Sequence, residues 1–231
     1  MARQCHGAHH RGTAPTIAVS PGGLVHSRVI VFRSAGPASR LILNHRQAKR
    51  ACGKAPSLQQ RLQQMVEVHN QHNVTQELAF YADDATFVIP GENPIVGKAA
   101  LRDLFESDAA TNSVLVFKDM VTTRDTVIVN SIKERNDFLR YLGVPELHYA
   151  PGTKIVFNKG LIQKTELAPS SEEDEKIFER QWQDVMGWLG AAHPELVKEA
   201  QSGWLARHGR KAAHAWMELL AEWQVSKSGP K

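Results

Sequence analysis

The sequence predicts an α+β fold in which helices come first and strands follow. Apolar residues recur at helical spacing over residues 58–69 and 98–105. From residue 114 to residue 167 the pattern changes to short runs of branched residues, which are typical of strands. Helices grouped ahead of a run of antiparallel strands indicate α+β rather than a parallel sheet. Two further apolar stripes follow Pro169 and predict a C-terminal helical extension.

Three parts are expected along the 231 residues: a basic extension (1–56), an α+β domain (57–169) and a C-terminal helical extension (170–231). Residues 1–66 hold ten Lys or Arg and no Asp or Glu, which leaves eighteen basic and twenty-four acidic residues for the remainder. A nucleic-acid-binding surface needs basic residues clustered on the domain itself. No nucleic-acid partner is therefore expected.

The basic extension is rich in Gly, Pro, Ser, His and Arg and lacks apolar periodicity. We interpret residues 1–56 as a disordered extension, which a misplaced start codon would also produce. The alternative is an organelle-targeting segment, because transit peptides are rich in Arg and poor in acidic residues. Apart from that alternative, a cytoplasmic location is expected.

The motifs predict no cofactor and no metal. Both cysteines, Cys5 and Cys52, lie in the basic extension, so the domain has neither a disulfide framework nor a CxxC zinc site. The chain contains no Walker motif, GxGxxG, HExxH or GxSxG. No apolar run approaches the ~18 residues of a membrane helix, so no membrane partner is expected.

The first two helices and the first strand are predicted from helix-capping residues and from residues that favour turns. Ser57 is the expected N-cap of the first helix, and Gln60 stands three residues later, as in a capping box. A second helix is expected over residues 74–81. Asp83 and Asp84 would then form a tight turn before a strand over residues 85–89, which a Pro-Gly pair ends.

The third helix is expected to begin at Gly97, with Leu101, Leu104 and Phe105 on one side. Two strands, a short helix and a hairpin are then expected at residues 114–118, 126–132, 135–142, and 153–157 with 161–167. Asn158-Lys159-Gly160 suits the turn of that hairpin.

The C-terminal helical extension begins with the acidic run Glu172–Glu175, which suits the first turn of a helix. Apolar stripes follow, and all five tryptophans lie in this part. We expect the extension to pack onto the domain. The alternatives are a lid over a pocket or the arm of a homodimer.

Residues 78–91 read LAFYADDATFVIPG, and with the surrounding residues 58–167 they resemble the NTF2-like (SnoaL-like) family. This family includes ketosteroid isomerases and polyketide cyclases. The resemblance implies a cone-shaped, curved antiparallel sheet wrapped on the N-terminal helices. It also implies a deep pocket for a small apolar organic ligand and cofactor-independent acid–base chemistry: isomerisation, cyclisation, dehydration or epoxide hydrolysis.

The catalytic residues of the isomerases are not retained. Alignment through the acidic turn places Met65 at their oxyanion-binding tyrosine and Ile89 at their proton-shuttling aspartate. Thr153 stands in place of their second oxyanion acid. Met and Ile cannot relay a proton, so the isomerase mechanism is not expected. Asp83 and Asp84 are interpreted as turn residues rather than as an acid–base pair.

His69 is the first candidate proton carrier. It follows Met65 by four residues and Val66 by three, so it lies on the apolar face of the first helix. In the family, this face looks into the pocket. An imidazole suits general acid–base work near neutral pH. The alternative is a core histidine whose hydrogen bonds are satisfied.

Glu134 is the second candidate proton carrier. By the alternation of a strand, Glu134 and Asn130 share a face with two isoleucines, so this face is expected to point inward. A buried carboxylate has a raised pKa and can act as an acid or a base. The alternative is a salt bridge at the rim with Arg135 or Arg140.

The residues expected to bind substrate are Tyr81, Ile89, Asn130, Asn136, Asp137, His148 and Tyr149. Asn136 and Asp137 could instead cap the short helix, and His148 and Tyr149 could be packed or face solvent. We therefore expect a small-molecule-binding domain, with a cofactor-independent acid–base enzyme as the leading hypothesis. The alternative is a non-catalytic ligand-binding or protein-interaction module of the same fold.

Overall fold

A computed structural model describes residues 55–203 and 205–228, all within the compact unit Gly53–Lys231. The interpretation of the basic extension lies outside these residues, apart from its last two. The elements are α1 (Leu58–Asn70), α2 (Val74–Leu78), β1 (Tyr81–Val88), β2 (Ile95–Val96), α3 (Lys98–Ala110), β3 (Val114–Thr123), β4 (Thr126–Arg135), α4 (Asp137–Tyr141), β5 (Leu147–Tyr149), β6 (Thr153–Asn158), β7 (Leu161–Glu166), α5 (Glu172–Ala192), η1 (Pro194–Leu196), α6 (Val197–Ser202) and α7 (Arg210–Lys227).

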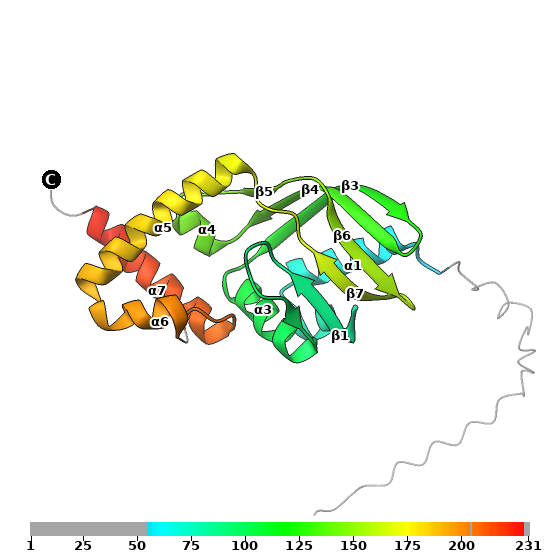
Figure 1. Cartoon of the computed structure of the whole chain (residues 1–231), viewed down its shortest axis with the longest axis horizontal. Coiled ribbons are helices and arrows are strands. Elements are labelled where there is room, and N and C mark those ends of the chain that lie inside the picture. Colours follow the sequence, from blue (N-terminus) through cyan, green and yellow to red (C-terminus); the bar gives the residue numbers. More distant parts are fainter. Residues whose placement is uncertain (1–54, 204, 229–231) are drawn as a thin grey trace, which may run out of the picture. The chain divides into compact units, whose positions relative to one another are not determined.

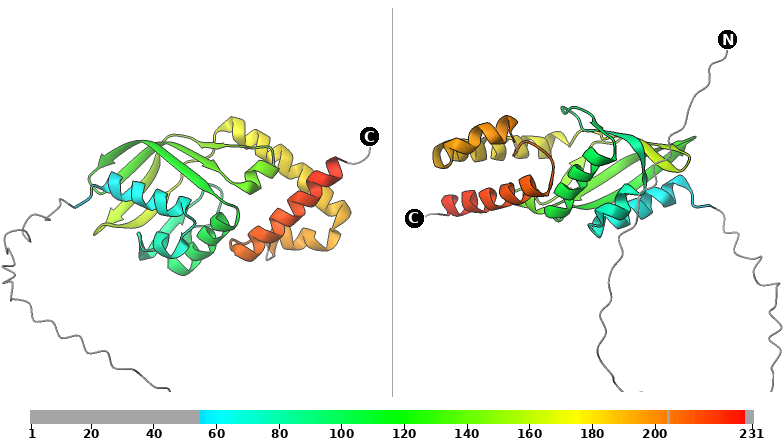
Figure 2. Two further views of the ribbon diagram at one scale, coloured as in Figure 1. Left: turned by 180° about the vertical axis from the view of Figure 1, so that it is seen from behind. Right: turned by 90° about the horizontal axis from the view of Figure 1, so that it is seen from below.

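The predicted α+β class is confirmed, with helices ahead of one curved sheet (Figure 1). The strand order is β2-β1-β7-β6-β4-β3, and β5 pairs with β4. The sheet is mixed rather than wholly antiparallel, because β1 runs parallel to β7. Helix α1 lies across one face of this sheet (Figure 2). The main core lies between that face and the helices α1, α2 and α3.

The start of α1 and the last hairpin follow the sequence prediction. Ser57 caps α1, and a capping box with Gln60 is complete. The hairpin between β6 and β7 turns at Lys159 and Gly160, whose φ angles of 49° and 79° are both positive. A two-residue hairpin with positive φ at both positions matches the twist of its strands. Sequence signals tied to one local geometry were thus reliable here.

The predicted acidic turn is wrong. Helix α2 ends at Leu78, and β1 already begins at Tyr81, so Asp83 and Asp84 lie within the strand. Pairing with β7 is irregular between Tyr81 and Thr86. Both carboxylates have partners on neighbouring elements, Lys98 for Asp83 and Gln163 for Asp84. The parallel partner strand therefore extends β1 over residues whose local preference is a turn.

The predicted alternation along β4 breaks in its middle. Val127 and Val129 are fully buried, and Ile132 is the next buried residue. The break coincides with an irregularity in the neighbouring strand β3. Asp119 of β3 has a φ of 52°, and it is not paired with Asn130 in the ladder between β3 and β4. Asn130 therefore does not share the inward face of Glu134, contrary to the prediction.

The outer edge of β3 is covered by side chains of α1. The Asn70 side chain accepts from Leu115 N at 2.8 Å and donates to Leu115 O at 2.9 Å. Gln59 Nε2 donates to Met120 O at 2.8 Å. These bonds occupy backbone groups of an edge strand that would otherwise be open to another strand. They also fix α1 over the inner face of the sheet.

The C-terminal helices pack against the domain, as expected. The helix α5 is capped by Ser171 and has four acidic residues in its first turn. The Gln224 side chain donates to Tyr141 O, and Gly209 N donates to Ser107 Oγ. Trp223 is 2% exposed, whereas Trp182 is only half-buried, although the stripe pattern suggests burial for both.

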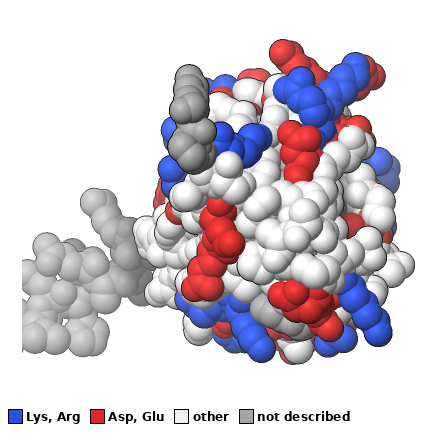
Figure 3. All heavy atoms as spheres, turned by 90° about the vertical axis from the view of Figure 1, so that its left-hand side faces the viewer, with Lys and Arg blue, Asp and Glu red and all other residues white. Residues whose placement is uncertain are grey.

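On the side formed by the C-terminal helices, acidic and basic side chains surround a broad uncharged area (Figure 3). None of the helices in the described ranges is both long enough and apolar enough to cross a bilayer.

Candidate functional site

A cavity of about 180 Å³ lies between the helices and the inner face of the sheet. A cavity needs only about 10–15 Å³ to hold one water, so this one has room for a small organic molecule. The apolar part of its wall consists of Met65, Phe87, Ile89, Leu104, Phe105, Leu115, Phe117, Ile132, Ile155 and Leu167. The polar part consists of His69, Glu77, Tyr81, Asp108, Ser113, Glu134, Tyr149, Thr153 and Thr165.

His69 lies on the wall of this cavity, in the last turn of α1. Its Nδ1 is 3.0 Å from Glu77 Oε1, and its Nε2 is 3.4 Å from Ser113 Oγ. Glu77 belongs to α2, which Asn73 caps. His69 and Glu77 are each 3% exposed. A short polar helix thus brings a carboxylate under the apolar face of α1.

Glu134 stands on β4 and accepts three hydrogen bonds. Ser113 Oγ donates to its Oε1 at 3.1 Å, and Asn136 Nδ2 donates to the same oxygen at 2.7 Å. Tyr149 OH donates to Oε2 at 2.6 Å. Tyr149 comes from β5, which pairs with β4 at this point. The carboxylate is therefore fixed from three directions.

The hydrogen bonds of His69 and those of Glu134 form one network, which Ser113 connects. Because Ser113 Oγ donates to Glu134, it accepts from His69 Nε2–H. His69 Nδ1–H then donates to Glu77, which makes the ring an imidazolium. Burial lowers the pKa of His69, but the hydrogen bond and charge of Glu77, with the nearby acids Asp108 and Glu134, outweigh burial and raise the pKa above its ordinary value.

Asp108 is a further acid on the cavity wall and is not among the residues predicted from the sequence. Burial, opposed by the charge of His69 and assisted by the charges of Glu134 and Glu77, raises the pKa of Asp108 to about 8. Nothing in the described part of the chain hydrogen-bonds or ion-pairs with its carboxyl group. The available signal was its spacing: Asp108 follows Leu104 by four residues on the apolar face of α3.

Two tyrosines complete the polar wall. Burial, followed by the charges of Glu77 and Asp108, raises the pKa of Tyr81 well above its ordinary value. Burial and Glu134 do the same to the pKa of Tyr149. Both therefore remain neutral hydroxyl groups at physiological pH, able to donate and accept hydrogen bonds.

The structure brings five of the predicted site residues to the cavity: His69, Tyr81, Ile89, Glu134 and Tyr149. Asn136 supports Glu134 from outside the wall, and it also caps α4 by accepting from Leu139 N. The predicted alternative for Glu134 is wrong, because Arg135 pairs with Glu146 and Arg140 pairs with Asp137.

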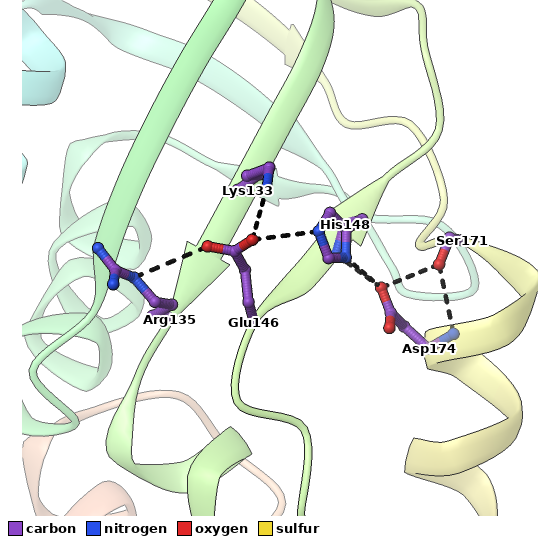
Figure 4. Close-up of polar contacts among 6 residues, drawn as sticks. All are labelled: Lys133, Arg135, Glu146, His148, Ser171 and Asp174. Atoms are coloured by element: carbon purple, nitrogen blue, oxygen red, sulfur yellow. Dashed lines mark hydrogen bonds and ion pairs between the residues drawn. The ribbon is translucent and has the colours of Figure 1, made fainter.

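Three predicted residues do not reach the cavity. Asn130 does not line the cavity, because the alternation of β4 is interrupted between Val129 and Ile132. Asp137 begins α4, where its carboxylate accepts from Asn112 Nδ2 at 2.7 Å. His148 points away from the wall and lies between Glu146 and Asp174, at 3.2 Å and 2.9 Å (Figure 4). Since alternate strand residues face opposite sides, the inward Tyr149 forces its neighbour His148 outward.

The positions that correspond to catalytic residues of the isomerases face the same cavity. Met65 and Ile89 line it with apolar atoms. Thr153 also lines it, but its hydroxyl already accepts from Ala168 N at 2.9 Å. The polar groups of this chain therefore stand at other positions around the same space. No three His, Cys, Asp or Glu side chains among the described residues are arranged to hold a metal ion.

Comparison with known proteins agrees with this fold. A family model described as a SnoaL-like domain matches residues 62–143. No curated protein matches the chain. Among solved structures, the epoxide hydrolase/cyclase-like enzyme SalBIII, of pyran ring formation in polyether salinomycin, is 14% identical; the match covers 51% of this chain and 92% of that chain, with a TM-score of 0.45.

A second similar structure is an NTF2-like protein of unknown function from Cytophaga hutchinsonii, 10% identical, with coverage of 55% and 98% and a TM-score of 0.42. A de novo designed protein with a curved β-sheet is 11% identical, with coverage of 55% and 94% and a TM-score of 0.41. The match over residues 62–143, on helices that precede a curved sheet, shows that this chain carries a SnoaL-like domain.

Proposed function

We propose that the domain binds a small, mainly apolar organic molecule in the cavity and transfers protons on it without a cofactor. The observation that carries this proposal is the contrast between two carboxyl groups on one wall. The carboxyl group of Asp108 has no hydrogen-bond partner among the described residues, and its pKa is raised to about 8. Glu134 accepts three hydrogen bonds. Two carboxyl groups in such different environments suit one acid and one base.

In this proposal Glu134 is the base and Asp108 is the acid. Glu134 takes a proton from the substrate, and Asp108 gives its proton to a heteroatom of the substrate. His69, an imidazolium held by Glu77, keeps the Ser113 hydroxyl donating to Glu134 and so orients the carboxylate that takes the substrate proton. After turnover Glu134 holds one proton more and Asp108 one proton fewer, and exchange with solvent restores both. This scheme covers isomerisation, cyclisation, dehydration and epoxide opening alike.

Deuterium exchange tests the proposal without a known substrate. Small apolar ketones, beginning with cyclohexanone and acetophenone, are incubated with the protein in D₂O, and NMR follows deuterium entering next to the carbonyl group. The wild-type protein should accelerate this exchange for ketones that bind. Glu134→Gln should slow it by at least about a hundredfold, since general base catalysis contributes roughly that much or more.

The matched control is Glu146→Gln, because Glu146 precedes β5 and does not line the cavity. It should exchange bound ketones at the wild-type rate. Ketone affinity, read from NMR line broadening, should be unchanged in Glu134→Gln. Equal exchange by the wild type and Glu134→Gln would refute the role of Glu134.

A second candidate function is non-catalytic ligand binding. Both ring nitrogens of His69 and both carboxylate oxygens of Glu134 already bond to protein groups. Such a satisfied network also serves to fix the shape of a pocket. The same experiment separates the two functions, since a binding module would hold ketones without exchanging them.

A further inference from the structure

The charge of the cavity wall is unbalanced. Three carboxyl side chains line it, from Glu77, Asp108 and Glu134. Among the residues that the structure describes, His69 is the only basic side chain on this wall, and no Lys or Arg lines it. The imidazolium charge of His69 is engaged by Glu77 and Ser113. The space inside is therefore more favourable for a cation than for an anion.

Asp108 is the acid with unused hydrogen-bonding capacity. Glu77 accepts from His69, and Glu134 has three donors, whereas both oxygens of Asp108 lack a partner in the described residues. The titratable groups around Asp108 are His69 of α1, Glu77 of α2, Tyr81 of β1, Glu134 of β4 and Tyr149 of β5. A carboxylate enclosed by protein is stabilised by a cation or by several donors, and none of those on this wall bonds to Asp108, since His69 bonds to Glu77 and Ser113.

The rest of the wall suits an organic cation. Aromatic side chains contribute from β1, α3, β3 and β5, namely Phe87, Phe105, Phe117 and Tyr149. Aromatic rings attract ammonium groups as well as apolar skeletons. An inorganic cation would find too few oxygen ligands, because among the described residues Asp108 is the only carboxyl group on the wall that no hydrogen bond or ion pair engages.

We propose that the cavity selects apolar molecules with a basic nitrogen, held as the ammonium ion against Asp108, and rejects carboxylates and phosphates. This inference rests on the proposed function only in that the same cavity binds the ligand. It does not require catalysis.

The binding step has a defined proton balance. At neutral pH, Asp108 is protonated and an alkylamine is an ammonium ion. Binding forms the pair between ammonium and carboxylate, so the Asp108 proton leaves to the buffer and the amine keeps its own. Near neutral pH, about one proton should therefore be released for each amine bound. A neutral ligand of the same skeleton should release none.

Three probes with one skeleton test the charge preference: benzylamine, benzyl alcohol and benzoate. Titration calorimetry at pH 7 should show benzylamine binding at least about tenfold more tightly than benzyl alcohol, with benzoate the weakest. The binding heat of benzylamine should differ between phosphate and Tris buffers. The difference should equal the difference between the ionisation heats of the two buffers, multiplied by about one proton. From pH 7 to pH 8.5, affinity for benzylamine should rise about five- to tenfold, because the fraction of ionised Asp108 grows.

Asp108→Asn identifies the residue. This variant keeps the size of the side chain, and it should lose at least tenfold in affinity for benzylamine, all proton release and the rise with pH. Its affinity for benzyl alcohol should stay within about twofold. The control is Asp103→Asn, on an exposed position of the same helix. It should behave as wild type. Proton release by the wild-type protein keeps the test decisive if Asp108→Asn fails to fold.

The outcomes separate the two proposals. Equal or tighter binding of benzyl alcohol, or benzylamine binding without proton release, would overturn the cation preference and leave the proposed function standing. Benzylamine binding through Asp108, with no deuterium exchange on any bound ketone, would support the cation preference and overturn the proposed proton transfer. Failure of all three probes to bind would overturn the inference and count against ligand binding in this cavity.

Discussion

The α+β domain and the C-terminal helices each have a core, and the two cores bury different kinds of side chain. All buried polar or charged residues among those described lie between residues 69 and 165: His69, Glu77, Thr111, Ser113, Thr153 and Thr165. The core of the C-terminal helices is apolar and aromatic, with Leu142, Leu189, Leu220 and Trp223 almost fully buried. Burying charge costs free energy that apolar packing does not. The first core thus contains buried polar groups of the proposed site, whereas the second is a purely apolar and aromatic core.

The largest expected effect of a single change is the loss of a charge partner in the first core. Glu77→Ala leaves the His69 ring buried without its acceptor, which should lower the free energy of unfolding by up to about 5 kcal/mol. Urea denaturation at pH 7 measures this loss. Replacing both residues with leucine should recover most of it, because no unpaired charge remains. A double variant as unstable as Glu77→Ala would show that packing, not charge, dominates this core.

In the second core the corresponding test is aromatic. Trp223→Ala should cost about 3–4 kcal/mol, as large-to-small changes at buried positions do. Trp182→Ala should cost less than half as much, although its ring is 4.9 Å from that of Trp216, because Trp182 is only partly buried. Denaturant midpoints of the two variants provide the comparison. Equal costs would mean that the exposed side of Trp182 is covered in solution.

The sequence predicted the first core better where the signal was periodic. His69 was found because it follows an apolar helical stripe, and Asp108 stands at the same kind of position on α3. Glu77 carries no such signal, since the five residues of α2 are too few to define a face. Its place on the cavity wall is seen only in the folded structure, where it pairs with His69.

Strand faces were predictable only where the alternation continued. Glu134 was placed correctly because it follows Ile132 by two residues. Asn130 was placed wrongly, since the break depends on the positive φ of Asp119 in the neighbouring strand. A backbone irregularity in one strand can interrupt the inward–outward alternation of its neighbour, and the apolar pattern of neither strand reveals it. The pairing of β1 with β7 hid Asp83 and Asp84 in the same way.

The pH dependence of stability should come mainly from the first core. The pKa of Asp108 is raised to about 8, so the folded state keeps a proton that the unfolded chain loses above about pH 4. Stability should therefore fall as pH rises between these values, by at most about 1.4 kcal/mol per pH unit for one proton. His69, with its raised pKa, adds to the fall only above about pH 6.5.

Asp108→Asn should remove the fall between pH 5 and pH 6.5, where other groups contribute little. Urea denaturation across this range is the measurement. The variant should be more stable than wild type at pH 7, as expected when a group is kept for function at a cost in stability. The same downward slope in both proteins would show that Asp108 is not enclosed.

The smallest expected effect lies at the contact between the two regions. Asp174, in the first turn of α5, accepts from His148 N and Nδ1 and from Ser171 Oγ (Figure 4). Although burial opposes it, these bonds lower the pKa of Asp174, so their contribution is present above about pH 4 and is lost as pH falls below its folded value. Asp174→Asn should cost only about 0.5–1 kcal/mol, because its partner His148 is exposed and charge pairs at the surface are screened by water and salt. Glu173→Gln, an exposed change in the same turn, is the control for the effect of charge at the helix start. A loss well above 1 kcal/mol for Asp174→Asn alone would mean that this contact, rather than the aromatic core, joins the C-terminal helices to the domain.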